Sequence, residues 1–214
     1  MNLSLRLKAL QQYSDDAAIE IWDIGCDHGL LGLSFVYQPN VQHIHLVDPS
    51  ALVVDSLFKK DLDSYITRED LKVTIHHSLG QAIKLTSSIH SIFIAGMGGQ
   101  EIKSIVENLI PQMTFKDRLI ISPHRNILEL RTYLSHSKLR LITEQVVFED
   151  GQFYQILVLS LVEDYPKVHA YGDLIWNTET GESYRKHQIH HFKTHRSGQS
   201  EAYVLYLISL YSRN

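Results

Sequence analysis

IEIWDIGCDHGLLG, residues 19–32, is the stretch that decides the fold class. A short apolar run ends at Asp23, and an apolar run at helical spacing begins at Leu30. This order predicts a strand, a tight turn and a helix. Gly25 and Gly29 allow the turn to bend sharply and to approach a ligand, as at the first strand of an open α/β sheet. We therefore expect the turn to hold a cofactor.

The acidic residues of this turn indicate which cofactor it holds. A dinucleotide-binding turn has the pattern G-x-G-x-x-G and presents backbone amides to a pyrophosphate. Asp23 and Asp27 would repel a pyrophosphate but suit the ammonium group and sulfonium centre of S-adenosylmethionine. The next apolar run, 43–47, ends at Asp48, which is placed to accept hydrogen bonds from both ribose hydroxyls of an adenosine. Together these acids predict a nucleotide-type cofactor, and the pair Asp23 and Asp27 favours S-adenosylmethionine.

Composition indicates a globular protein of a reducing compartment. Hydrophobic residues make up 44% of the 214 residues and charged residues 21%. The single cysteine, Cys26, excludes an intramolecular disulfide framework. The net charge of -4 argues against a protein that coats nucleic acid indiscriminately. No apolar run approaches the roughly 18 residues that cross a bilayer, and the N-terminus is unlike a signal peptide. We expect a cytoplasmic protein without a membrane partner, either a monomer or a weak dimer.

The rest of the chain predicts an α/β fold, with a mostly parallel sheet and helices on both faces. Strands and helices alternate up to about residue 134, and an Asp-Gly pair at 150–151 then indicates an antiparallel hairpin. Residues 1–162 are expected to form this domain, and residues 163–214 a connector plus a short helical C-terminal extension, with helices at 182–195 and 199–212. The other expected helices are 2–13, 30–37, 51–65, 100–109 and 127–134, and the other strands are 72–76, 91–95, 118–122, 139–148 and 153–161.

Two further loops are expected at the same edge of the sheet as the first turn. Strand 91–95 runs into Gly96-Met97-Gly98-Gly99, and strand 118–122 runs into Pro123-His124-Arg125-Asn126. Because ligands bind at the carboxyl ends of parallel strands, the three loops predict one shared pocket.

These motifs together resemble one family. DIGCDHGLLG (23–32), VDP (47–49), IFIAGMGG (92–99), LIISPHRNILELRTYL (119–134) and VVFEDGQFYQILVLSL (146–161) are similar to segments of the TrmK-type tRNA (adenine-N1)-methyltransferases. The resemblance covers about residues 3–162. It implies a class I enzyme with a Rossmann-like domain and a helical C-terminal extension, which uses S-adenosylmethionine to methylate N1 of adenine 22 in tRNA.

The resemblance also implies which residues serve the reaction. Asp27, His124 and Asn126 are expected beside the reacting groups, Asp27 to stabilise the positive charge of the methylated ring and His124 or Asn126 to hold the base edge. Pro123, Arg125, Arg131 and Tyr154 are expected to contact RNA. The expected cofactor contacts are Asp23, Gly25, Cys26, Asp27, His28, Gly29, Asp48, Pro49, Ser78, Leu79, Ala95, Gly96, Met97, Gly98 and Gly99.

Two departures from the family leave alternatives open. The family's Pro-Asn is Pro123-His124 here, which favours a methyltransferase acting on another RNA base or on a small molecule. The family's acid or amide after the third strand is Leu79 here, preceded by Ser78, which favours a non-catalytic RNA-binding relative.

The most basic tract, 184–196, is expected either to contact the tRNA backbone or to form a solvated helix face. Its candidate phosphate contacts are Arg185, Lys186, Lys193 and Arg196, and Tyr184 or Phe192 is available for stacking. His187, His191 and His195 follow helical spacing, but no cysteine or carboxylate completes a set, so we expect no metal.

Overall fold

The computed structural model describes residues 2–60, 66, 68–172, 174–194 and 201–212. Within these ranges no helix is long and apolar enough to cross a membrane.

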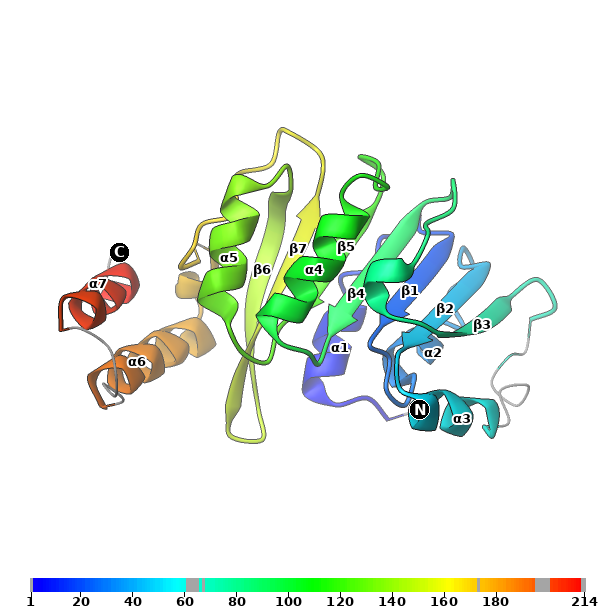
Figure 1. The fold of residues 1–214 in the computed structure, drawn as a ribbon, viewed down its shortest axis with the longest axis horizontal. Helices are drawn as coiled ribbons and strands as arrows, with labels where there is room; N and C mark the ends of the chain where they lie inside the picture. Colours follow the sequence, from blue (N-terminus) through cyan, green and yellow to red (C-terminus); the bar gives the residue numbers. More distant parts are fainter. Residues whose placement is uncertain (1, 61–65, 67, 173, 195–200, 213–214) are drawn as a thin grey trace.

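Seven strands form one sheet in the order β3-β2-β1-β4-β5-β7-β6 (Figure 1). Neighbouring strands from β3 to β5 are parallel, and β7 runs antiparallel to both β5 and β6. The mostly parallel sheet with an antiparallel hairpin is thus confirmed. The strands are β1 Glu20–Ile24, β2 His43–Asp48, β3 Lys72–His77, β4 His90–Ala95, β5 Arg118–Ser122, β6 Arg140–Glu149 and β7 Gln152–Ser160.

Helices cover both faces of this sheet. One apolar cluster joins α4 (Gly99–Leu109) and α5 (Ile127–His136) to one face, and a second joins α1 (Leu5–Gln11), α2 (Leu30–Leu33) and α3 (Ala51–Phe58) to the other. A short 3-10 helix, Gly80–Ala82, follows β3.

Two helices are shorter than the sequence predicts. The first crossover helix, expected over 30–37, ends at Leu33, because residues 34–37 form turns that still bury Phe35 and Val36 and so keep the apolar pattern. The helix expected over 51–65 ends at Phe58, and residues 61–65 lie outside the described ranges.

The C-terminal region adds a 3-10 helix, Leu174–Asn177, and the helices α6 (Glu179–Thr194) and α7 (Glu201–Ser212). They lie beside β6 at one end of the molecule (Figure 1) and bury an apolar cluster against Val146. α6 begins three residues before the predicted 182, because the Thr178 hydroxyl accepts a hydrogen bond from the Gly181 N–H at 3.0 Å and caps the helix.

The strand order sets where a ligand can lie. From β1 the chain moves outward through β2 and β3, and then returns to β4 on the other side of β1. This reversal leaves a crevice beyond the carboxyl ends of β1 and β4, which is the usual ligand site of such sheets.

Candidate active site

A cavity of about 480 Å³ lies at the carboxyl ends of β1, β2 and β4. That volume is in the range of small-molecule sites, a few hundred to 1,000 Å³ or so. The cavity brings together predicted residues from the loops that follow β1, β4 and β5. Its lining consists of Arg6, Leu7, Asp23, Gly25, Cys26, Asp27, His28, Leu30, Leu31, Asp48, Pro49, Ala95, Gly96, Met97 and His124.

The turn after β1 has the backbone that the glycine pattern predicts. Gly25 and Gly29 adopt φ values of 74° and 68°. A side chain at Gly25 would also meet the terminal methyl of Met97, so the loops after β1 and β4 lie close together there. This close approach shapes the floor of the cavity.

Asp23 is a buried acid beneath the turn. Its Oδ2 atom accepts a hydrogen bond from the Gly32 N–H at 2.8 Å, which ties the end of β1 to α2. Burial, helped by the neighbouring Asp48 and Asp27, raises the pKa of Asp23 to about 7 against the lowering effect of the Gly32 hydrogen bond. A positively charged ligand in the cavity would favour the ionised form.

Asp48 is held at the end of β2 by two backbone amides. Its carboxylate accepts from the Ser50 N–H at 2.8 Å and from the Asp27 N–H at 3.3 Å. The residue is buried yet lines the cavity, and a carboxylate has about four acceptor positions. Positions therefore remain for two hydroxyls of a ligand.

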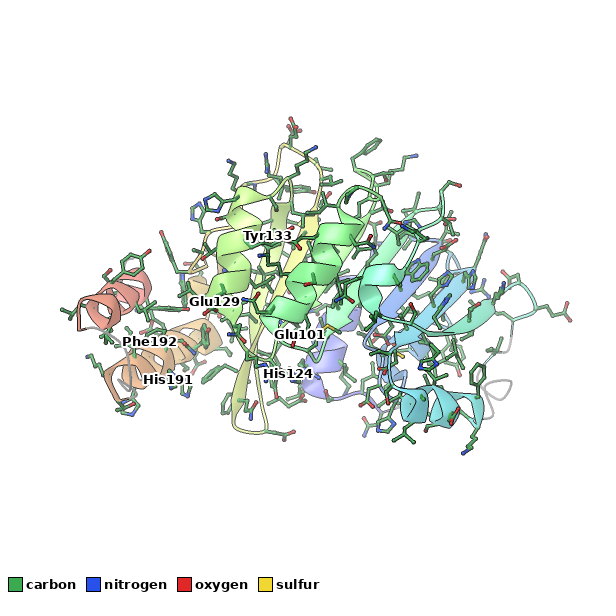
Figure 2. All side chains as sticks on the ribbon, in the orientation of Figure 1. Glu101, His124, Glu129, Tyr133, His191 and Phe192 are labelled. Atoms are coloured by element: carbon green, nitrogen blue, oxygen red, sulfur yellow. The ribbon has the colours of Figure 1, made fainter. Side chains whose placement is uncertain are left out.

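The mouth of the cavity brings together three segments distant in sequence. His124 follows β5 and lies at the lower edge of the sheet in Figure 2. Its ring Nε2 contacts the Arg6 guanidinium of α1, its ring centroid lies 5.4 Å from that of Tyr154, and Arg6 stacks over the Tyr154 ring at 4.8 Å. Burial and then the charge of Arg6 lower the pKa of His124, so its imidazole is neutral at pH 7.

Asp27 lies at the same mouth in an exposed position. Its side chain is 72% exposed, and its backbone φ is 49°. The carboxylate therefore faces the solvent from which a substrate would arrive.

Five predicted cofactor contacts do not line the cavity: Gly29, Ser78, Leu79, Gly98 and Gly99. A side chain at Gly99 would lie 2.4 Å from the carbonyl oxygen of Asn126, so this glycine instead permits close packing of two loops. Ser78 donates its backbone N–H to the Asp48 carbonyl at 3.1 Å, and Leu79 is exposed. The loop after β3 thus supports the cavity from outside.

Arg131 corrects a prediction. The sequence places it on an RNA-facing helix, but its side chain is 1% exposed and lies 2.6 Å from the Glu144 carboxylate. It also donates to the Gln155 side chain at 2.8 Å and to the His169 carbonyl at 2.8 Å. The prediction that Arg131 contacts RNA is therefore wrong, and the residue instead joins α5 to β6 and β7. The signal that could have revealed it is the pair Glu144 and Gln155, two polar residues within the long strands of the hairpin that need a partner when buried.

Among the residues that the structure describes, the other predicted RNA contacts lie at the surface with two exceptions. Pro123 and Tyr184 are buried, so Tyr184 is not available for stacking and packs in the cluster under α7. Arg125, Asn126, Lys186 and Lys193 are exposed, Tyr154 and Arg185 are half-buried, and Arg196 lies outside the described residues.

The sequence prediction missed four residues that line the cavity. Arg6 and Leu7 come from α1, far from the motifs in sequence, and Leu30 and Leu31 follow the first turn.

The thiol of Cys26 does not have the character of a nucleophile. Cys26 is buried, and burial raises the pKa of its thiol, whereas a nucleophilic cysteine requires a lowered pKa.

Comparison with protein families supports this site. The model of the family described as "Methyltransferase domain" matches residues 3–157, which contain every cavity residue. The chain belongs to this methyltransferase domain family.

A curated relative shares much of this domain. The chain is 29% identical over 162 residues to the tRNA (adenine(22)-N(1))-methyltransferase of Bacillus subtilis, which covers 74% of this chain. The match spans 65% of that relative's length.

Solved structures of methyltransferases share the whole fold. The B. subtilis m1A22 tRNA methyltransferase TrmK superposes with a TM-score of 0.75 at 22% identity, covering 98% of this chain and 97% of that one. TrmK of M. capricolum, solved in complex with S-adenosyl-homocysteine, superposes with a TM-score of 0.76 at 18% identity, covering 98% and 96%. The C-terminal helices therefore belong to the shared architecture.

Proposed function

We propose that this chain transfers a methyl group from S-adenosylmethionine to N1 of an adenine in tRNA. The observation that carries the proposal is the cavity at the carboxyl ends of β1, β2 and β4, with three acids on its wall, inside a methyltransferase domain. The similarity to an enzyme named for adenine 22 supports that position as the target.

The cavity residues fit this cofactor. Asp48 keeps free acceptor positions that suit a ribose diol, and Asp23 offers a buried negative charge that suits an ammonium group. Gly96 has no neighbour within 4 Å of a would-be side chain, so a flat group can lie against its backbone. Bound S-adenosylmethionine supplies the methyl group on a positively charged sulfur.

The protein's main task is to position the base. Adenine N1 carries a lone pair and needs no prior deprotonation, so alignment of the reacting atoms provides much of the rate. His124 is neutral and lies at the cavity mouth, where its ring can hydrogen-bond the base edge. Adenine 22 lies within folded tRNA, so the base must be extruded before it reaches His124.

Asp27 stabilises the product side of the reaction. Methylation at N1 leaves a positive charge on the adenine ring, and the Asp27 carboxylate lies at the cavity mouth to meet it. Arg6 stands beside His124 in the same mouth and can contact the phosphate backbone near the target.

The test is transfer of labelled methyl groups to unmodified tRNA transcripts, with product nucleosides resolved by mass spectrometry. We expect N1-methyladenosine, none of it on a transcript with guanine at position 22, and a loss of about 100-fold in kcat/KM for Asp27→Ala. Asp16→Ala, which removes an exposed acid remote from the cavity lining, is the matched control and should retain activity.

Other outcomes select between the alternatives. Methylation of another base or of a metabolite would replace the tRNA adenine as substrate while keeping the cofactor. Binding of tRNA without binding of S-adenosylmethionine would contradict an enzymatic role altogether.

A further inference from the structure

A second polar cluster lies at the end of the sheet opposite the cavity. Glu20, His43 and His90 are the first residues of β1, β2 and β4, and His45 follows His43 on the same face of β2. The length of β1, about 13 Å, separates this end of the sheet from the cavity. The proposed methyl transfer uses none of these side chains.

The nitrogen and oxygen atoms of the cluster have the spacing of metal ligands. Glu20 Oε2 lies 3.3 Å from Nε2 of His45 and 3.6 Å from Nε2 of His90. One ligand atom each from Glu20, His43 and His45 lie within 4.8 Å of one another. Ligand atoms of a tetrahedral ion with bonds of about 2.0–2.2 Å are roughly 3.3–3.6 Å apart, so the distances from Glu20 to His45 and to His90 match.

Two of these atoms are buried and lack a hydrogen-bond partner among the residues that the structure describes: Glu20 Oε2 and His45 Nε2. Both side chains are more than nine-tenths buried, and the two atoms lie next to one another. A buried carboxylate oxygen without a donor is costly, and an ion bound to both atoms would remove that cost.

Surrounding contacts fix the direction in which each histidine offers its nitrogen. The Nδ1 atom of His90 lies 2.8 Å from the Asp117 carboxylate, which can only accept, so Nδ1 donates, and Nε2 lies toward Glu20 and the Thr86 hydroxyl, which is 3.2 Å away. A carboxylate behind a ligating histidine is the usual support of such sites. His45 is oriented through its Nδ1, 2.9 Å from Nε2 of His76.

We propose that this cluster binds a divalent first-row transition ion, with Glu20 and His45 as central ligands and His43 and His90 on either side. A mixed set of imidazole and carboxylate donors suits Zn²⁺. His43 is half-buried while the other three are buried, so an ion enters past His43. Because its ligands come from β1, β2 and β4, the ion would stabilise the central strands.

The experiment titrates Zn²⁺ into the metal-stripped full chain by calorimetry, with Co²⁺ as a spectroscopic probe. We expect one ion per chain, Co²⁺ bands of a low-coordinate site, and a Tm raised by about 5–10 °C at 100 times Kd. Glu20→Gln and His43→Gln should each weaken Zn²⁺ binding at least tenfold. His43→Gln, at a half-buried position, keeps the test decisive if Glu20→Gln fails to fold.

A second pair of histidines provides the control. His187 and His191 are exposed one helical turn apart on α6, where Figure 2 labels His191, and could bind zinc by themselves. The double variant His187→Gln and His191→Gln should retain both the ion and the Tm shift. Loss of the ion in that variant, its retention in His43→Gln, or no Zn²⁺ binding by the parent chain would each overturn the proposal.

Discussion

Two buried charged regions of this protein differ in how their charges are balanced. The Arg131 guanidinium meets the Glu144 carboxylate at 2.6 Å, and both side chains are almost completely buried. Asp23 and Asp48 in the cavity accept hydrogen bonds from backbone amides, and among the described residues neither forms an ion pair. A buried charge met by its opposite holds the fold together, whereas a buried charge met by amides alone is available to a charged or hydroxylated ligand.

The largest effect is expected where the balanced pair is broken. Arg131→Met leaves the Glu144 carboxylate buried without its cation and should lower the free energy of unfolding by about 3–5 kcal/mol. Urea unfolding of the variant measures this loss. Adding Glu144→Gln to Arg131→Met should recover part of it, because the stranded charge is gone. An Arg131→Met variant as stable as the parent would contradict the structural role.

Removing an acid on the cavity side should weaken ligand binding most of all. Asp48→Ala deletes acceptors for two ligand hydroxyls, each worth about 1.5–3 kcal/mol as a charged hydrogen bond, so affinity for S-adenosylhomocysteine should fall on the order of 100-fold or more. Calorimetry measures the affinity. Asp55→Ala removes the same charge from an exposed position on α3 and should bind like the parent. Equal affinity of all three proteins would exclude Asp48 as a ribose contact.

The acids and the glycine at the strand ends beside the cavity could be predicted from sequence because their signals are local. Asp23, Gly25 and Asp48 each occupy fixed places at the end of a strand, and alternation of strands with helices puts those ends at one edge. Arg6 could not be found this way, since its position beside His124 depends on how α1 packs under the hairpin. Arg131 was misjudged for the same reason, because its partners lie on strands that follow it in sequence.

The raised pKa of Asp23 makes both the stability of the protein and ligand binding in the cavity depend on pH. The pKa of Asp23 is raised to about 7 in the folded chain, from an ordinary value near 3.8, so the folded state holds a proton that the unfolded state releases. Asp23 therefore favours folding at low pH, and that contribution is lost as the pH rises from about 4 to 7.

A cationic ligand must displace this proton from Asp23. Affinity for S-adenosylmethionine should then drop roughly fivefold between pH 7 and pH 6. Asp23→Asn should bind more weakly at pH 8, with a flat profile over the same range, and should be more stable than the ligand-free parent at pH 8. Calorimetry at each pH measures both profiles, and a parallel slope in parent and variant would assign the pH dependence to another group.

The smallest effect is expected on the exposed face of α6, where the charges of the lysines are not buried. Lys186 lies 3.4 Å from Glu182 with 76% of its side chain exposed, and Lys193 is also exposed. If α6 contacts the tRNA backbone, Lys186→Ala should weaken tRNA binding a few-fold and reduce the slope of log affinity against log salt by roughly 1. Lys116→Ala, which removes an exposed lysine just before the amino end of β5, is the matched control. The change in slope is the decisive measurement, because a lysine that only pairs with Glu182 releases no counterions from RNA, and its removal would leave the slope as it was.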